Sequence, residues 1–296
     1  MRLLLPVIVL TTVTACQQTP RSGQPTFPTT GQIERLDPGL DAIIRPDAVV
    51  EVIAEGFDWS EGPLWVESAD MLLFSDVPKN RVYKWTEAGG TEVYLEPSGY
   101  TGVEPSNRRE PGSNGLTLDQ EGRLVLCQHG DRRMARMETP LDQPEALFTT
   151  LVDCYTDKRL NSPNDVVYDS RGDLFFTDPP YGLPRQNDDD PIKELNFNGV
   201  YRLASDGTLH LLTDTLTRPN GLAFFPDESK LLVANSDPAK PNWYLISLDE
   251  DRAVTDIRIF HRAAGGPGIP GLPDGLKIDR NGIVFASGPG GVWIFD

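Results

Sequence analysis

Five polar residues that could bind a ligand recur along the chain, each at the head of a short apolar run typical of a β-strand. These lead residues are Glu61, Asn114, Asn164, Asn220 and Asp274. Their numbers differ successively by 53, 50, 56 and 54. A repeat of about fifty residues, built from short strands and turns, is the signature of a β-propeller. The spacing therefore predicts an all-β fold of repeated blades, in which the lead residues hold equivalent positions.

The lead residues would meet at one end of a central channel, because the first strand of each blade lines it. Two carboxylates and up to three amide carbonyls would then form a cage of hard oxygen ligands, which suits calcium. Clustered histidines or thiolates, which zinc or copper would need, are absent: His129, His210 and His261 fall in different repeats. Asn-Gly and Asp-Gly are also ordinary turn dipeptides, and Glu61 alone could be a solvated strand end. The constant register of all five favours the cation site.

Each repeat contains short β-rich runs separated by turn residues. The expected strands of the first three repeats are 64–66, 71–75, 82–85, 92–95, 116–118, 124–127, 133–137, 146–151, 166–168, 174–176, 199–203 and 209–212. The fourth repeat follows the same order through Phe260. No stretch after the N-terminal leader has a sustained 3.6-residue periodicity, so we expect very little helix. The longest irregular insert is 178–198, a length at which loops are usually functional or mobile.

The fifth repeat is shorter than the others. Its expected strands are 276–278, 283–286 and 292–295, and the sequence ends at Asp296. Because an open ring leaves bare strand edges, propellers close by pairing their first and last strands. We therefore expect a ring that is incomplete at its C-terminus. Either the sequence stops short of the full gene product, or something else closes the ring.

The composition narrows the class of partner. The 296 residues are 39% apolar, and 44 acidic against 27 basic residues give a formal charge of −17. No run of Lys or Arg opposes this excess, so we expect no nucleic acid and no anionic membrane surface as a partner. We expect one propeller domain and a monomer. Cys127 and Cys154 either form a disulfide, which an exported compartment permits, or remain free buried thiols.

The N-terminus is predicted to be an export signal. A basic start at Met1-Arg2 precedes an apolar run over 3–10 and the small residues Val-Thr-Ala-Cys at 13–16. The apolar run is too short to span a bilayer as a helix. The last four residues resemble a bacterial lipobox, in which Cys16 is lipidated; the alternative is an ordinary signal peptide with a chance cysteine. Gln17 resembles the outer-membrane sorting pattern of Gram-negative cells.

We therefore expect an exported protein on the periplasmic face. Its only expected contact with a membrane is through its lipid anchor. After the lipoprotein signal peptide at 1–16, the residues up to about 32 are rich in Pro, Gly, Ser, Thr and Gln, which cannot bury a core. The following residues are transitional. We place a flexible tether at 17–45 and the propeller domain at 46–296.

Several motifs together resemble the senescence marker protein/gluconolactonase (regucalcin-like) family. They are SEGPLW at 60–65, SPNDV at 162–166, TDPPYG at 177–182, RPNGL at 218–222 and PDGLKID at 273–279. The resemblance runs from about Glu51 to Asp296, and bacterial gluconolactonase-type members look most similar. It implies a six-bladed β-propeller, here C-terminally incomplete with about five blades. It also implies one divalent cation in the channel, usually calcium, and hydrolysis of lactones or, in some relatives, of organophosphates.

The resemblance also implies roles for individual residues. Glu61, Asn220 and Asp274 match the family's metal ligands, and Asn164 matches the channel asparagine that contacts substrate or metal-bound water. Asp274 also matches the residue proposed as general acid and base. Ser162 stands where animal members carry an arginine, so sugar-acid recognition as in those members is not implied.

Three further residues look like substrate-binding groups at the channel mouth. They are Asn114, His129 and Tyr181. His129 is equally consistent with a structural histidine, and Tyr181 with a residue that only shapes the Pro-Pro turn.

These residues predict a calcium-dependent lactonase. The cation, calcium or another divalent ion, would polarise the lactone carbonyl and activate water, while Asp274 takes the proton and returns it to the leaving alkoxide. No Gly-x-Ser-x-Gly elbow is present, so a covalent serine hydrolase is disfavoured. One alternative is a phosphotriesterase or aryl esterase on the same cage. The other is a non-catalytic propeller that binds a protein or another ligand, in which calcium only stabilises the structure.

Overall fold

The chain divides into two units, one ending at Glu55 and the other spanning Gly56–Asp296. The computed structural model describes residues 26–263 and 268–296. The predicted signal peptide, its Cys16, and the tether up to residue 25 lie outside the described residues.

The first unit contains one short strand pair and one short helix. Strand β1 (Thr29–Thr30) pairs antiparallel with β2 (Val50–Glu51). A 3-10 helix, η1 (Pro38–Ala42), follows Asp37, whose carboxylate accepts a hydrogen bond from the Gly39 N–H at 2.7 Å. The described part of the predicted tether therefore carries β1 and η1.

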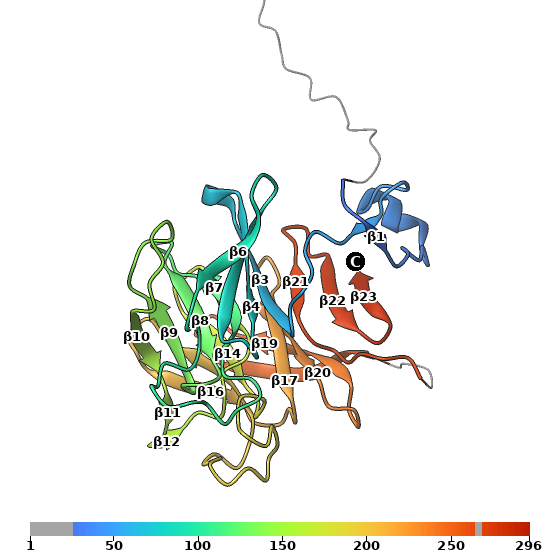
Figure 1. Cartoon of the computed structure of the whole chain (residues 1–296). Helices are drawn as coiled ribbons and strands as arrows, with labels where there is room; N and C mark the ends of the chain where they lie inside the picture. The colour runs from blue at the N-terminus through green and yellow to red at the C-terminus, as the bar shows by residue number, and fades with distance from the viewer. Residues whose placement is uncertain (1–25, 264–267) are drawn as a thin grey trace, which may run out of the picture. The chain divides into compact units, whose positions relative to one another are not determined.

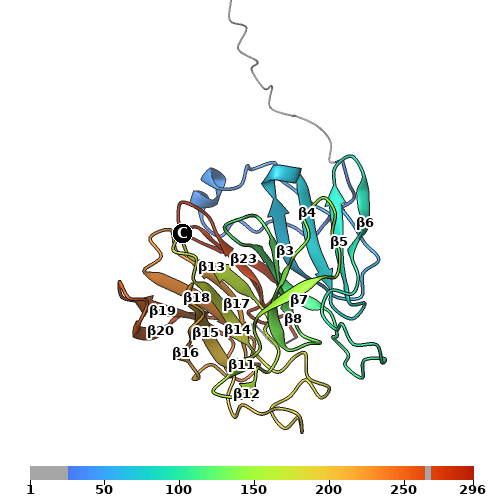
Figure 2. The ribbon, with the colours of Figure 1, turned by 90° about the vertical axis from the view of Figure 1, so that its left-hand side faces the viewer.

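The second unit contains five antiparallel sheets of three or four strands that follow one another along the chain, from the blue-cyan β3–β6 to the red β21–β23, and one two-stranded hairpin (Figures 1 and 2). Within each sheet, neighbouring strands are also neighbours in sequence, so each sheet is a meander. The first four sheets have four strands and the fifth has three. This five-bladed arrangement confirms the predicted all-β propeller fold.

The strands of the first two sheets are β3 (Ser60–Val66), β4 (Met71–Asp76), β5 (Arg81–Thr86), β6 (Gly90–Leu95), β7 (Ser113–Leu118), β8 (Leu124–Gln128), β9 (Arg133–Met137) and β10 (Phe148–Val152). Those of the next two are β13 (Val166–Tyr168), β14 (Leu174–Asp178), β15 (Gly199–Leu203), β16 (Leu209–Thr213), β17 (Pro219–Phe224), β18 (Lys230–Asn235), β19 (Asn242–Leu248) and β20 (Val254–Arg262). The fifth sheet is β21 (Leu276–Ile278), β22 (Val284–Gly288) and β23 (Gly291–Phe295). Every strand expected in the repeats is present.

Helix is scarce, as predicted. Beside η1, the described residues contain one further 3-10 helix, η2 (Glu67–Ala69), and no α-helix. No described helix has the length and apolar character needed to cross a membrane.

A hairpin that the sequence did not suggest, β11 (Cys154–Tyr155) with β12 (Lys158–Arg159), turns at Thr156 and Asp157, which have positive φ of 49° and 66°. It was missed because such turns normally contain glycine or asparagine.

Hydrophobic side chains fill the space between successive sheets. One cluster lies between the first two sheets, including Leu73 and Leu126, and another between the second and third, including Cys127 and Phe176. Similar clusters join the third to the fourth sheet and the fourth to the fifth. Each fully buried Leu or Phe stabilises the fold by about 1.5–3 kcal/mol, so these interfaces hold the blades together.

The two cysteines of the second unit are free. Cys127 is fully buried in an apolar cluster, and this burial raises the pKa of its thiol. Of the two possibilities left open by the sequence, the disulfide is therefore wrong.

A buried polar residue ends the second strand of each four-stranded sheet and anchors the segment that precedes the first strand. These residues are Asp76, Gln128, Asp178 and Asn235, and all are at most 1% exposed. Asp178 accepts hydrogen bonds from the N–H groups of Ser162 at 2.7 Å and Asn161 at 2.8 Å. The side-chain oxygen Oδ1 of Asn235 similarly accepts from the Arg218 N–H at 2.7 Å. The approach to each innermost strand is thus fixed by side chains.

Hydroxyl groups near the same strand ends hold the lead segment of the next blade. Ser75 Oγ donates to the backbone carbonyl of Asn114 at 2.8 Å, and Thr177 Oγ1 donates to that of Asn220 at 2.8 Å. Ser236 Oγ donates to the carbonyl of Pro273, next to Asp274. The first, third and fourth blades therefore help to position the lead residue of the blade that follows.

We predict that Asp178→Ala lowers the free energy of unfolding by about 2–5 kcal/mol, because two buried N–H groups lose their acceptor. Burial also raises the pKa of Asp178 from 3.8 to about 7, partly offset by those N–H bonds. The folded state therefore keeps a proton that the unfolded chain has lost, and stability from Asp178 falls as pH rises through about 7. Urea denaturation should show a larger deficit at about pH 5 than at about pH 8.

The matched control is Asp189→Ala in the same insert. The Asp189 side chain is exposed, and its ion pair with Arg185 is long at 3.9 Å. It should leave stability unchanged within about 0.5 kcal/mol. Equal stability of the two variants would contradict the anchoring role of Asp178.

Candidate functional site

The structure places all five lead residues at the same end of the innermost strands. Glu61, Asn114 and Asn220 lie in the first two residues of β3, β7 and β17. Asn164 and Asp274 come two residues before β13 and β21. Successive innermost strands are in contact from β3 to β21. The fold therefore gives these residues the equivalent positions that their spacing predicted.

Glu61 and Asp274 lie close enough to repel each other. Burial, followed by the charge of Asp274, raises the pKa of Glu61 to about 8. Burial also raises the pKa of Asp274 to about 6, with the nearby charge of Asp165 adding to it and a hydrogen bond from Asn220 opposing it. The structure thus brings together Glu61, Asn220 and Asp274, the three residues that match the family's metal ligands.

Asn220 is oriented by its amide nitrogen. Its Nδ2 donates to Ser236 Oγ at 2.9 Å and its side chain also bonds to Asp274. Since the nitrogen is committed, the carbonyl oxygen Oδ1 is the atom left to act as a ligand.

Asn114 and Asn164 are fixed through their backbones. The backbone carbonyl of Asn164 accepts from the Gly115 N–H at 2.7 Å, and the Asn164 N–H donates to the backbone carbonyl of Thr177 at 2.8 Å. Gly115 cannot be replaced easily, because a Cβ there would approach the Asn164 carbonyl to 2.7 Å. Among the described residues neither asparagine side chain has a hydrogen-bond partner, so both amides are available to a ligand.

Tyr181 lies near the carboxylates of Asp274 and Glu110. Burial raises the pKa of its hydroxyl to about 12, and the negative charge of Asp274 adds to this rise. The positive charge of Arg218 and a hydrogen bond with Ser236 both oppose it. Ser236 therefore contacts both Tyr181 and Asn220.

His129 occupies a different kind of position. Its side chain is fully buried, both ring nitrogens lack a hydrogen-bond partner among the described residues, and Nδ1 lies 3.5 Å from Glu110 Oε2. The imidazole is therefore a buried neighbour of Glu110.

Three site residues were missed by the sequence reasoning. Trp59 donates from Nε1 to Glu61 Oε1 at 2.7 Å. Asp165 ties two blades together by accepting from the N–H groups of Val166 at 2.9 Å and Leu222 at 3.1 Å. The third is Glu110, from the loop before β7. Asp165 could have been noticed, because it replaces the glycine that follows most other lead residues, whereas no sequence pattern marks Glu110.

No group of three or more His, Cys, Asp or Glu side chains in the described part of the chain is arranged to hold a metal ion. The predicted ligand set contains only two carboxylates, those of Glu61 and Asp274. A cation here would have to take amide oxygens as well, which calcium accepts.

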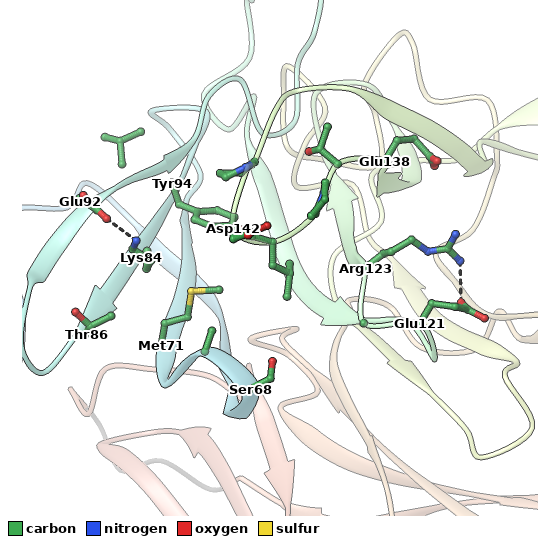
Figure 3. Close-up of a pocket in the computed structure, with 17 residues that line it drawn as sticks. Ser68, Met71, Lys84, Thr86, Glu92, Tyr94, Glu121, Arg123, Glu138 and Asp142 are labelled. Atoms are coloured by element: carbon green, nitrogen blue, oxygen red, sulfur yellow. Dashed lines mark hydrogen bonds and ion pairs between the residues drawn. The ribbon is translucent and has the colours of Figure 1, made fainter.

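A cavity of about 920 Å³ lies at the other end of the strands, between the first two sheets (Figure 3). It is lined by apolar groups such as Met71, Tyr94 and Leu141. The cations on its rim are paired, with Lys84 on Glu92 at 2.5 Å and Arg123 on Glu121 at 2.7 Å. Because the lead residues are at the opposite strand ends, this cavity is separate from the candidate site.

Comparison with known proteins gives consistent results. The model of the SMP-30/gluconolactonase/LRE-like region matches residues 59–296. The gluconolactonase of Zymomonas mobilis is 45% identical over 271 residues, which make up 90% of this chain and 75% of that protein. A gluconolactonase structure from Xanthomonas campestris superposes with a TM-score of 0.75 at 34% identity, covering 93% of this chain and 85% of that one.

A more distant structure shows the fold alone. The calcium-binding protein regucalcin of Agrobacterium tumefaciens superposes with a TM-score of 0.58 at 15% identity, covering 79% of this chain and 69% of that one. Together these findings confirm the resemblance that the motifs indicated.

We predict that the fluorescence of Trp59 reports the ionisation of Glu61 in chelator-treated protein. Since the pKa of Glu61 is raised to about 8, its carboxyl is neutral at lower pH, and its hydrogen bond from Trp59 becomes charge-assisted only as pH rises through that value. Tryptophan emission should therefore change around pH 8, and Trp59→Phe should abolish the change.

Trp65→Phe is the matched control. Trp65 makes the same type of bond two residues along the chain, to Glu67 Oε2 at 2.8 Å, at the far end of β3. It should leave the pH-dependent change intact. A change that survives Trp59→Phe and disappears in Trp65→Phe would contradict the assignment.

Proposed function

Because the chain belongs to the SMP-30/gluconolactonase/LRE-like family, we propose that it hydrolyses a sugar lactone such as gluconolactone with the help of a bound calcium ion. Two relatives named as gluconolactonases, at 45% and 34% identity, support the substrate class. The observation that carries the proposal is the convergence of Glu61, Asn220 and Asp274 at one end of the innermost strands.

The residues fit a calcium ion by the chemistry of their donors. Glu61 and Asp274 are two half-buried carboxyl groups whose charged forms repel each other, and a cation would offset this repulsion. Asn220 and Asn164 offer amide oxygens, and calcium accepts six to eight oxygen ligands in tolerant geometry. We propose that these four residues hold the ion, with water and substrate completing its ligands.

The ion would supply positive charge that polarises the lactone carbonyl and makes water more acidic. Asp274 takes one proton from the water as the water oxygen bonds to the carbonyl carbon. It returns that proton to the ring oxygen as the ester C–O bond breaks. The product is a hydroxy acid that ionises, so turnover releases protons. Asn220 orients Asp274 through its hydrogen bond.

We predict that proton release from gluconolactone exceeds the spontaneous rate, stops in excess chelator and returns with excess calcium. Glu61→Gln should weaken calcium binding, measured by calorimetry, at least about tenfold, because a buried carboxylate ligand is lost. Asp274→Asn should lower kcat by about 10²–10⁴-fold with the fold preserved. Circular dichroism of each variant verifies that it is folded.

Glu67→Gln provides the control, since Glu67 follows the other end of β3. It should leave both calcium affinity and turnover unchanged. A folded wild-type protein that is inert towards lactones in both conditions would contradict the proposal. Turnover of phosphotriesters or aryl esters instead would assign the same residues to another ester class.

We also propose that the protein is exported and held on the periplasmic face by a lipid on Cys16. The support is the leader sequence, with its basic start, apolar run and Val-Thr-Ala-Cys segment.

We predict that the protein is found in the membrane fraction of a bacterial host and that Cys16→Ala moves it to the soluble fraction. Cys154→Ala is the control and should leave the distribution unchanged. Membrane association that survives Cys16→Ala would contradict the lipid anchor.

A further inference from the structure

The loop between β6 and β7 brings an additional carboxylate, Glu110, to the candidate site. Its charge is among the causes that raise the pKa values of Glu61, Asp274 and Tyr181, which come from three different parts of the chain. Glu110 is therefore near all of them, although no repeat or motif in the sequence marks it.

Both carboxylate oxygens of Glu110 are near a fixed partner. Oε1 accepts a hydrogen bond from Gln186 Nε2 at 2.6 Å, and the same nitrogen lies 3.1 Å from the Tyr181 carbonyl. Oε2 lies 3.5 Å from His129 Nδ1. Gln186 has a φ of 54°, in the left-handed region that non-glycine residues rarely adopt. The backbone thus adopts an unfavourable conformation at the residue that holds Glu110.

Glu110 can be reached by a ligand. Its side chain is 21% exposed, whereas the side chain of His129 behind it is fully buried. A carboxylate has about four acceptor positions, and the hydrogen bond from Gln186 occupies one. Acceptor capacity on Glu110 therefore remains for a ligand.

The network around Glu110 is incomplete among the described residues. Both nitrogens of the buried His129 lack a partner, and the distance from Nδ1 to Glu110 is just beyond a good hydrogen bond. Buried polar groups are normally paired, so an unpaired imidazole calls for a functional reason. A small shift of Glu110 towards His129, when a ligand takes its free acceptors, would complete the bond.

The negative charge of Glu110 has an electrostatic cost at this position. Glu61, Asp165 and Asp274 already place negative charge in the same region, and a fourth charge adds repulsion. A glutamine would have the same size without that repulsion. What the carboxylate provides is strong hydrogen bonding to hydroxyl donors, because bonds to an ionised acceptor are about twice as strong as neutral ones.

We propose that Glu110 accepts hydrogen bonds from ring hydroxyl groups of the lactone and so selects polyhydroxylated lactones, with Gln186 and His129 as its positioning residues. This inference rests on the proposed lactonase function. It concerns recognition of the substrate, whereas Glu61, Asn220 and Asp274 serve the cation and the proton transfer.

The test compares Glu110→Gln with wild type on gluconolactone and on δ-valerolactone, which has the same ring without hydroxyl groups. We expect kcat/KM for gluconolactone to fall about ten- to a hundredfold, mainly through KM, and that for δ-valerolactone to change less than about threefold. Calcium affinity by calorimetry should be unchanged within about threefold. Gln186→Ala should give the same selectivity change in weaker form.

Glu104→Gln is the matched control, because Glu104 lies exposed in the same loop. It should alter neither substrate. Equal losses on both lactones together with weaker calcium binding would overturn the proposal and make Glu110 part of the cation site. An unchanged Glu110→Gln variant would also overturn it.

A second measurement separates this inference from the lactonase proposal. If the wild-type protein turns over no lactone, binding of the polyol glucitol is measured by ligand-observed NMR. Binding that Glu110→Gln weakens at least about tenfold would support hydroxyl recognition even though the proposed reaction had failed. Binding that is absent, or equal in both proteins, would overturn it.

Discussion

The site depends on buried polar residues that fix the backbone just before each innermost strand. Asp178 is the fullest example, since it holds the N–H groups of Asn161 and Ser162 and thereby the segment that carries Asn164. Hydroxyls such as Thr177 Oγ1 then connect each blade to the lead residue of the next. A lead residue is therefore positioned by two blades at once, which allows oxygens from distant parts of the chain to share a small volume.

This arrangement concentrates like charge, which opposes folding. Glu61 and Asp274 are both half-buried, and each has a raised pKa because partial burial and neighbouring carboxylates disfavour its charged form. The apolar clusters between the sheets provide the stability that offsets this repulsion. Unfavourable electrostatics of this kind cluster at functional sites. The proposed cation would offset them here. Glu110 adds a further carboxylate to the same region, and its charge also raises the pKa values of Glu61 and Asp274.

The blades and the lead residues could be predicted from the sequence because both repeat. Alternation of apolar runs and turns located the strands, and the spacing placed Glu61 and Asp274 at equivalent positions. Glu110 could not be predicted, because it comes from a loop without a counterpart in other repeats. The burial of His129 was equally hidden, since it depends on how Gly182 packs: a Cβ there would meet His129 at 2.5 Å. Long-range packing, which leaves no local pattern, decided both.

We propose that a cation binds among Glu61, Asn220 and Asp274, next to Trp59. Terbium, which substitutes for calcium and luminesces when a nearby tryptophan is excited, tests this directly. We predict luminescence that calcium displaces, that Trp59→Phe or Glu61→Gln abolishes, and that Trp65→Phe leaves unchanged. Luminescence that is absent in the wild type, or that persists in both Trp59→Phe and Glu61→Gln, would show that no cation binds at these residues.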